Sequence, residues 1–370
     1  MKNTLPFLIV CFLYLPIASL FGQESAIEIK PRNYICYRAS APLNMDGLLN
    51  EADWQYAPWS DDFGDIEGSL KAKPEYRTRM KMLWDSSFLY IAAELEEPHV
   101  WATLTERESV IFYDNDFEIF IDPDGDTHHY AEYEMNALNT QWDLMLLKPY
   151  RDDTIHNVAI DNWNFNGIKS AVHVNGTINN PEDKDKGWTL EIAIPLDALT
   201  ELSSTGKIPE KGEQYRINFS RVEWTLDVVD GKYKKRTHSI NGKLKLLPEN
   251  NWVWSPQGVI AMHQPETWGF LQFSGKTSGK GVDAYVPDPD NDVKWALRIL
   301  YHKEKAYFDK NRVYTTDLKL LGLDKYMLNG KLFAPEIKTT FTMYEATFPG
   351  SDGKTSWHIV QDGRIWKDIR

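Results

Sequence analysis

The chain has 370 residues, of which 42% are hydrophobic and 13% aromatic, and its formal net charge at pH 7 is −13. This length suffices for one large core and a second, smaller unit. The negative charge argues against nucleic acid and anionic lipid as partners, because both bind basic surfaces. With 14 Trp and 18 Tyr, the chain has aromatic side chains either for a large core or for stacking against sugar rings.

The N-terminus has the pattern of a secretory signal peptide. Lys2 is followed by the apolar run 5–21 and then by a small residue, which predicts cleavage after residues 1–22. The run is short and contains two prolines, so it does not predict a membrane span. We therefore expect a secreted, periplasmic or cell-surface protein. Cleavage would remove Cys11 and leave Cys36 alone, so no intramolecular disulfide is expected.

The first part of the mature chain predicts a turn, a short helix and a hairpin. Residues 43–54 contain an Asp-Gly turn that leads into a short helix, which delivers Trp54 to the core. Residues 77–84 and 88–95 alternate as two strands around the turn 85–87.

A β-meander at 117–147 forms the centre of the predicted fold. Phe117, Ile119 and Ile121 alternate with Glu118, Phe120 and Asp122, the period of a strand with both faces partly covered. Strands at 130–136 and 141–147 follow after short turns. Further strands are expected at 171–178, 187–194, 214–224 and 268–273, while the segment around Trp252 and Trp254 reads as irregular. Roughly nine or more strands with no long helix predict an all-β fold, a jelly-roll-like β-sandwich.

The C-terminal part has a different composition. Residues 276–292 are rich in Gly, Asp and Pro, so we expect a linker with sparse contacts between a sandwich at 23–275 and a smaller unit at 293–370. Apolar residues recur at helical spacing from Val293 to about residue 310, and strands with an Asp-Gly hairpin follow. The pattern predicts a small α+β appendage.

Five local patterns occur in the order found in one family of sugar-binding domains. They are Met45-Asp46-Gly47 with Glu51 and Trp54, 83–85 with Leu89-Tyr90, 116–122, 187–194 and Trp268-Gly269. Over about residues 40–275 the chain resembles the family 9 carbohydrate-binding modules and their family-9-like relatives. The resemblance implies a β-sandwich that binds the end of a polysaccharide or a short sugar, often beside structural calcium.

The resemblance also implies which residues contact the sugar. The family clamps its ligand between two aromatic residues, which correspond to Phe112 or Tyr113 and to Trp254 here. Asn136 matches a family ligand, whereas Glu134 stands where an arginine is expected. Well-characterised modules have Trp at the first aromatic position, so this chain departs from the pattern there.

Other side chains extend this candidate sugar site. Arg216, Asn218 and Arg221 supply hydrogen-bond donors on a neighbouring strand, and Trp224, Trp252 and Trp268 could add to an aromatic platform. Packing in the core is the alternative for each tryptophan. The predicted function is non-catalytic binding of a poly- or oligosaccharide that supports carbohydrate catabolism. A glycoside hydrolase or a cell-surface complex is the expected protein partner.

Asp122, Asp124 and Asp126 place three carboxylates at alternate positions of a tight loop, which suits Ca²⁺. An ordinary solvated acidic turn is the alternative. No organic cofactor is expected.

Two rival functions remain open at this point. Glu118, Glu132 and Glu134 lie on neighbouring strands and could form the carboxylate pair of a glycoside hydrolase. A haem-binding electron-transfer sandwich is the second rival, with ligands drawn from Met135, Met145, Met262 and His263.

Overall fold

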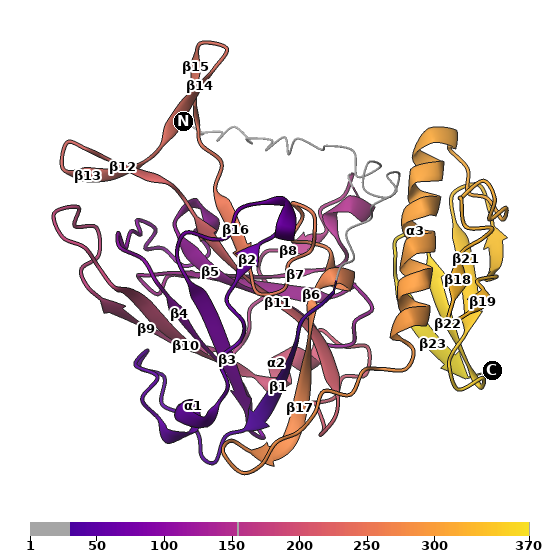
Figure 1. Ribbon diagram of the computed structural model, residues 1–370, viewed down its shortest axis with the longest axis horizontal. Helices are drawn as coiled ribbons and strands as arrows, with labels where there is room; N and C mark the ends of the chain where they lie inside the picture. The colour runs from indigo at the N-terminus through magenta and orange to yellow at the C-terminus, as the bar shows by residue number, and fades with distance from the viewer. Residues whose placement is uncertain (1–29, 154, 370) are drawn as a thin grey trace, which may run out of the picture.

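The computed structural model describes residues 30–153 and 155–369 (Figure 1). The predicted signal peptide lies outside the described residues. Within them, no helix combines the length and apolar character needed to cross a membrane. Cys36 is buried and carries a free thiol.

The larger part of the chain is a two-layered β-sandwich built from one continuous set of paired strands. The path runs β8-β7-β6-β5-β11-β17-β1-β3-β4-β10-β9, with β16 paired to β11 and β2 paired to β16. It passes from one layer to the other at β17, which pairs with β11 and, in parallel, with β1. The layer that ends in β9 contains β1 (Asn33–Arg38), β3 (Thr78–Trp84), β4 (Phe88–Leu95), β9 (Lys169–Asn175) and β10 (Gly187–Pro195).

The second layer carries the predicted meander. It contains β2 (Gly64–Asp65), β5 (Asp116–Asp122), β6 (Tyr130–Asn136), β7 (Gln141–Leu146), β8 (Ala159–Ile160), β11 (Gln214–Glu223), β16 (Asn250–Val253) and β17 (Gly269–Thr277). Short helical segments connect these strands: α1 (Ala52–Tyr56), η2 (Gly68–Leu70), η3 (Ile111–Tyr113), η4 (Tyr150–Asp152), α2 (Leu196–Thr200) and η5 (Pro265–Thr267).

The core lies between the two layers, as the two-residue period of the strands requires. Phe117, Ile119 and Ile121 of β5 belong to one buried cluster with Met80 and Met82 of β3. All five side chains have no exposed surface. The predicted sandwich and the predicted core face of β5 are therefore confirmed.

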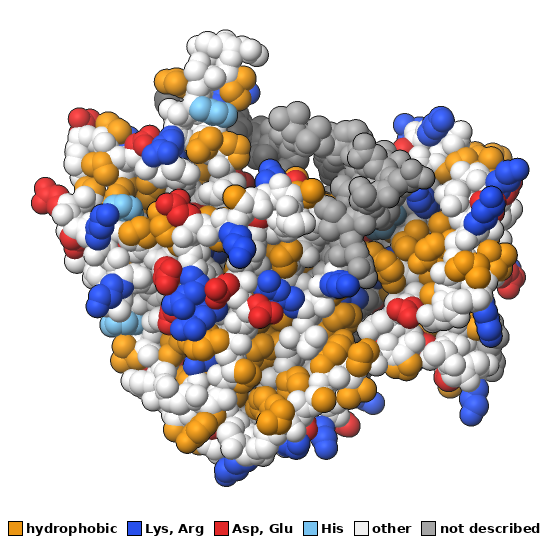
Figure 2. Space-filling view, in the orientation of Figure 1, with side chains coloured by type: hydrophobic (Ala, Val, Ile, Leu, Met, Phe, Trp, Pro, Cys, Tyr) orange, Lys and Arg blue, Asp and Glu red, His pale blue; other side chains and the backbone are white. Residues whose placement is uncertain are grey.

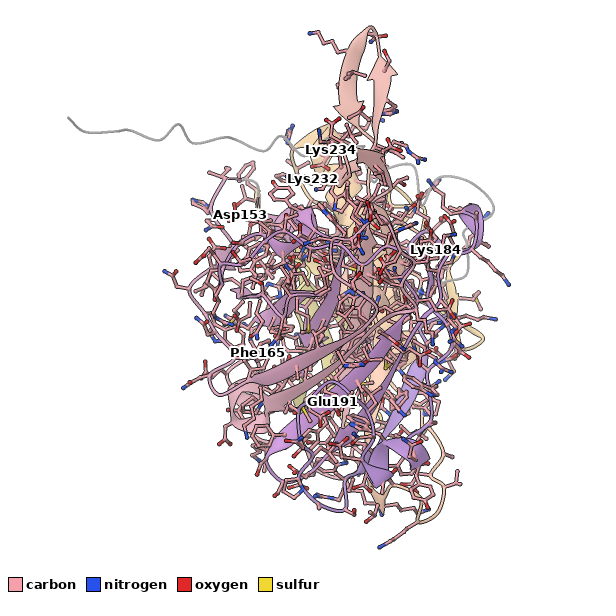
Figure 3. The ribbon with its side chains drawn as sticks, turned by 90° about the vertical axis from the view of Figure 1, so that its left-hand side faces the viewer. Asp153, Phe165, Lys184, Glu191, Lys232 and Lys234 are labelled. Carbon is pink, nitrogen blue, oxygen red and sulfur yellow. The ribbon has the colours of Figure 1, made fainter. Side chains whose placement is uncertain are left out.

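Two hairpins project from one end of the sandwich. They are β12 (Leu226–Val229) with β13 (Lys232–Lys235), and β14 (Thr237–Ile240) with β15 (Lys243–Leu246). Figure 3 shows Lys232 and Lys234 at this end of the molecule. The connection between β11 and β16 thus leaves the sheet and returns to it.

The C-terminal residues form a second unit with its own core. Helix α3 (Asn291–Asn311) packs on the antiparallel sheet β20 (Glu336–Thr339), β21 (Tyr344–Pro349), β22 (Thr355–Val360) and β23 (Ile365–Ile369), and β18 (Met327–Leu328) pairs with β19 (Lys331–Leu332). Its buried cluster includes Leu297, Leu300, Phe333 and Ile359. Helix α3 lies on the side of this unit that faces the sandwich (Figure 1).

Polar contacts hold the segment that connects the two units. Gln272 Nε2 donates a hydrogen bond to the carbonyl of Ala284 at 3.0 Å, and its Oε1 accepts one from the N–H of Val286 at 2.8 Å. Gln214 Nε2 donates to the Val286 carbonyl at 2.6 Å. Polar groups of the sandwich thus hold the backbone of this extended segment, while Val282 and Val286 are 82% and 66% exposed. The linker and its boundaries remain a prediction.

The two units meet through polar contacts around the loop after β5. Arg364 Nε lies 3.3 Å from Asp126 Oδ2, and Arg298 Nη2 donates to the Asp126 carbonyl at 3.3 Å. On the other side of the contact, Arg151 Nε donates to the Tyr301 hydroxyl at 3.0 Å. These contacts join residues more than 100 positions apart and hold the C-terminal unit against the sandwich.

Candidate functional site

The face of β5 and β6 that points away from the core carries a cluster of buried carboxylates. Glu118 lies opposite Glu134 on β6 and opposite Ser220 on β11. Oxygen atoms of Asp116, Glu118 and Glu134 all lie within 4.8 Å of one another. Each of these three carboxylates exposes 5% of its surface or less. Like charges buried this closely cost free energy unless partners or protons compensate them.

Backbone donors compensate these carboxylates in part. Asp116 Oδ1 accepts a hydrogen bond from the N–H of Val222 at 3.2 Å, and Glu134 Oε2 accepts one from the N–H of Phe112 at 2.9 Å. Asp116 Oδ2 and Glu134 Oε1 are buried and accept no hydrogen bond from any residue that the structure describes. Each of these two oxygens can therefore hold a proton.

Burial raises the pKa of each carboxyl group in the cluster. The pKa of Glu118 is raised to about 7, and that of Glu132 to about 8, where the charge of Glu118 is the second cause. For Asp116 and Glu134 the pKa lies well above the ordinary value, again first because of burial and then because of Glu118. The cluster consequently retains protons near neutral pH.

We expect the protein to lose stability as the pH rises through the range of about 5 to 8.5. In this range the folded state binds more protons than the unfolded state, because the folded-state pKa values of Glu118 and Glu132 exceed the ordinary value of 4.5. The loss of stability caused by ionising these carboxyl groups is absent at pH values below their pKa in the unfolded state and complete above their pKa in the folded state. Each unit of difference between the two pKa values corresponds to about 1.4 kcal/mol. Thermal denaturation at several pH values measures this slope. Glu118→Gln should flatten it, and an unchanged slope in that variant would contradict the assignment.

An aromatic cluster lies beside the carboxylates, at the end of the strands where η3 packs. Nε1 of Trp224 donates to the Phe112 carbonyl at 2.8 Å, and Trp101 and Tyr233 complete the buried part of the cluster. The ring centroid of Tyr113 lies 4.8 Å from that of Phe112, and 47% of Tyr113 is exposed. One aromatic ring of the cluster is therefore accessible from solvent.

Lys235 of β13 covers part of this cluster. Its Nζ lies 3.5 Å from the ring centroid of Trp224 and 5.4 Å from that of Tyr113. Burial lowers the pKa of Lys235. The sequence analysis missed this residue, although Tyr233 and Lys235 are two positions apart and must share one side of a strand.

Trp254 does not belong to the aromatic cluster, which corrects the prediction that it is a clamp residue. It exposes 1% of its surface and lies in the core, with its ring centroid 6.0 Å from that of Phe219. Its N–H donates to the Phe219 carbonyl at 2.9 Å, so the backbone continues the β16–β11 pairing. The residues just before it form the strand β16, which ends at Val253, where an irregular loop was expected, and the side chain of Trp254 points between the layers. Trp224, and not Trp254, lies beside Phe112 in the aromatic cluster.

Arg221 is also buried, which excludes the predicted contact with a sugar in this structure. It exposes 1% of its surface, and its guanidinium pairs with Glu97 and Glu223, each at 2.8 Å. Nη1 donates to the carbonyl of Glu96 at 2.8 Å. The donors of Arg221 are thus used within the protein.

Asn136 has a structural role at the end of β6. Its Nδ2 donates to the Leu104 carbonyl at 2.9 Å, and its Oδ1 accepts hydrogen bonds from the N–H groups of Leu138 and Thr140, each at 3.0 Å. Asn136 has no exposed surface. It fixes the turn between β6 and β7, so the predicted sugar contact is not supported by its geometry.

The loop after β5 brings together the three predicted calcium ligands. Oxygen atoms of Asp122, Asp124 and Asp126 lie within 4.8 Å of one another. Asp122 accepts hydrogen bonds from the N–H groups of Gly125 and Thr127, each at 2.9 Å. Burial, followed by the charges of Asp124 and Asp126, raises the pKa of Asp122 well above its ordinary value. A divalent cation would relieve this repulsion, and the side chains therefore fit calcium.

The candidate haem ligands do not converge. Met135 lies in the core between the layers. His263 lies against Phe120 and Tyr130 on the opposite face of the sheet, with a ring centroid 5.7 Å from that of Phe120. Met262 packs against the same cluster as Phe120, whereas Met145 packs against the core. Ligands separated by a sheet cannot coordinate one iron.

The two packed layers of strands place the protein in the class of β-sandwiches. A family model described as "Carbohydrate family 9 binding domain-like" matches residues 45–241, which is more than half of the chain, and the protein belongs to this family. The matched residues include the whole aromatic cluster and the carboxylates beside it. Membership supports carbohydrate binding as the function.

Three solved structures illustrate the similarity. A family 9 carbohydrate-binding module from Caldicellulosiruptor kristjanssonii in complex with cellotriose has 17% identity and a TM-score of 0.41, over 69% of this chain and all of that one. A family 9 module from the same organism in complex with glucose has 16% identity and a TM-score of 0.41, over 68% of this chain and all of that one. A putative carbohydrate-binding protein from Bacteroides uniformis has 15% identity and a TM-score of 0.47, over 66% of this chain and all of that one. No curated protein matches the chain.

Proposed function

We propose that the protein binds a poly- or oligosaccharide at the aromatic cluster around Tyr113. The observation that carries the proposal is the exposed ring of Tyr113, which packs against the partly buried ring of Phe112 within the family match. An aromatic ring offers an apolar face against which the C–H groups of a pyranose can pack. A few polar groups beside it then fix the orientation of the sugar.

A lysine beside Tyr113 supplies a complementary polar group. Lys235 offers a donor, with its Nζ 5.4 Å from the ring centroid of Tyr113, whereas Glu134 and Asp116 are buried and not open to a ligand in this structure. Trp224 is 6% exposed and lies beneath Lys235, so in this proposal it supports the cluster from below. Tyr113 is therefore the aromatic residue that we assign to the sugar.

We infer a non-catalytic role in the capture of carbohydrate after export from the cytoplasm, in support of its breakdown. A glycoside hydrolase or a cell-surface complex is the protein partner that suits this role. Hydrolysis by the carboxylates themselves is the alternative, favoured by the raised pKa values of Glu118 and Glu132. Both residues expose 6% of their surface or less, which restricts their contact with a substrate.

A glycan array with the protein lacking residues 1–22 tests this function. We expect a defined set of neutral glycans to bind, and their reducing ends to stay constant during incubation. Absence of binding to any glycan would contradict carbohydrate capture. Release of reducing ends that disappears in Glu118→Gln would establish the hydrolase instead.

We propose that calcium binds at Asp122, Asp124 and Asp126 and stabilises the loop that contacts the C-terminal unit. An ion that binds the folded state alone raises the melting temperature by mass action. Millimolar Ca²⁺ should therefore raise the melting temperature relative to EDTA, and Asp124→Asn should reduce the effect. An equal melting temperature in both solutions would remove calcium from this account.

A further inference from the structure

A cavity of about 410 Å³ lies between the sandwich and the C-terminal unit. Its walls come from the loop after β5, β11, η5, β17, the segment 286–289, α3 and the strands β22 and β23. The volume falls within the roughly 300–1,000 Å³ of small-molecule pockets. The aromatic cluster around Tyr113 contributes no residue to it. The space-filling view shows the two units as separate lobes (Figure 2).

Helix α3 presents its polar side to the cavity. The side chains involved are spaced three and four residues apart, which places them on one face of the helix: Asn291, Lys294, Trp295 and Arg298. The opposite face carries Leu297 and Leu300 into the C-terminal core. The cavity therefore borders the N-terminal half of α3.

Two arginines in the wall of this cavity lack a charged partner. Arg216 Nη1 donates to the Trp268 carbonyl at 2.6 Å, and the guanidinium stacks on Phe270 at 3.8 Å. Arg298 exposes 3% of its surface and donates to the hydroxyl of Thr127 at 3.2 Å and to two backbone carbonyls. Neither arginine forms an ion pair with a residue that the structure describes. Burial lowers the pKa of both arginines, and the charge of Arg298 further lowers that of Arg216, whose pKa falls to about 10.

Two of the three carboxylates that line the cavity are paired with cations: Asp288 with Lys294 at 2.7 Å and Glu266 with Arg151 at 3.0 Å. The third, Asp124, accepts a hydrogen bond from Ser204 at 2.7 Å. Lys367 adds a further exposed cation at the rim, 5.4 Å from the ring centroid of Trp357. The wall thus carries positive charge that the surrounding carboxylates do not neutralise by direct contact.

We propose that this cavity is a second ligand site, which binds a carboxylate-bearing saccharide such as a uronic acid or a short uronate-containing oligosaccharide. The planar guanidinium groups of Arg216 and Arg298 match the geometry of a carboxylate. Trp295, Phe270 and Trp357 provide aromatic walls for the sugar ring. The ligand would contact both units and add a bridge between them.

Titration calorimetry with a matched pair of probes tests this site in the protein without residues 1–22. Methyl β-glucuronide and methyl β-glucoside differ in the carboxylate alone. We expect the glucuronide to bind at least about tenfold more tightly, as a charged hydrogen bond predicts, and Arg216→Gln to remove this preference. Lys331 is an exposed lysine on β19 outside the cavity, so Lys331→Ala should bind the glucuronide like the wild type.

Equal binding of the two probes, or full preference in Arg216→Gln, would overturn the proposal. If Arg216→Gln does not fold, Trp295→Ala replaces it, and undiminished glucuronide binding there would count equally against the site. Competition by inorganic phosphate at the same concentration as the glucuronide would overturn the saccharide class in favour of a general anion site. Tyr113→Ala should leave glucuronide binding unchanged, which separates this site from the neutral-glycan site.

Discussion

Replacing Trp254 with alanine is expected to lower the free energy of unfolding by about 3–5 kcal/mol, the usual cost of removing a buried tryptophan. The side chain exposes 1% of its surface and packs against Phe219 in the core of the sandwich. A Cβ atom at Gly269 would lie 2.3 Å from the ring, so the backbone of β17 closes directly over it. The vacated space cannot be refilled without movement of this strand.

Urea denaturation of Trp254→Ala measures this loss, and Tyr113→Ala is the control. Tyr113 is half exposed and outside the core, so its truncation should change stability by less than about 1 kcal/mol. A Trp254→Ala variant as stable as the wild type would place Trp254 outside the core and return it to consideration as a sugar contact.

Removal of the Arg221 guanidinium should cost a similar amount. Arg221→Ala leaves Glu97 and Glu223 buried without their cation, and breaking a buried ion pair typically costs about 3–5 kcal/mol. The pKa of Glu223 already lies well above its ordinary value because of burial. We expect denaturation at pH 8 to show a larger loss than at pH 5, since the unpaired carboxylates can take up protons at the lower pH.

Arg236→Ala provides the matched control for Arg221. Arg236 pairs with Asp227 at 2.9 Å, but both side chains are nearly half exposed. Water screens such a pair, so its loss should cost less than about 1 kcal/mol. Equal losses for the two variants would contradict the difference in burial on which the prediction rests.

The strands and their core faces could be predicted because they depend on local alternation. Phe117, Ile119 and Ile121 show the two-residue period, and the structure buries all three. The Asp-Gly turn and Trp54, which carried part of the family resemblance, prove to be one structural unit. Trp54 Nε1 donates to Glu191 Oε1 at 2.6 Å, and Glu191 Oε2 accepts a hydrogen bond from the N–H of Gly47 at 2.7 Å. Patterns of this kind report the fold more directly than the ligand site.

The candidate site could be predicted in part. Phe112 and Tyr113 precede β5, and their place beside the sheet follows from chain order. Trp254 was misassigned because two asparagines and a following proline hide the strand β16. Whether a tryptophan faces the core or solvent depends on the other layer of the sandwich, which local periodicity does not contain. The position of Lys235 could not be predicted either, because the hairpin β12–β13 places it over Trp224 through tertiary contacts that local sequence patterns do not contain.

The affinity of Tyr113→Ala for a glycan identified on the array tests the central claim most directly. The account predicts binding at least about tenfold weaker than that of the wild type, since a stacked aromatic anchor contributes roughly 1–3 kcal/mol, with the melting temperature unchanged. Tyr56 on α1 is also exposed, at 66%, and lies outside the aromatic cluster, so Tyr56→Ala should bind like the wild type. Undiminished affinity of a folded Tyr113→Ala variant would contradict the claim that carbohydrate binds at this aromatic cluster.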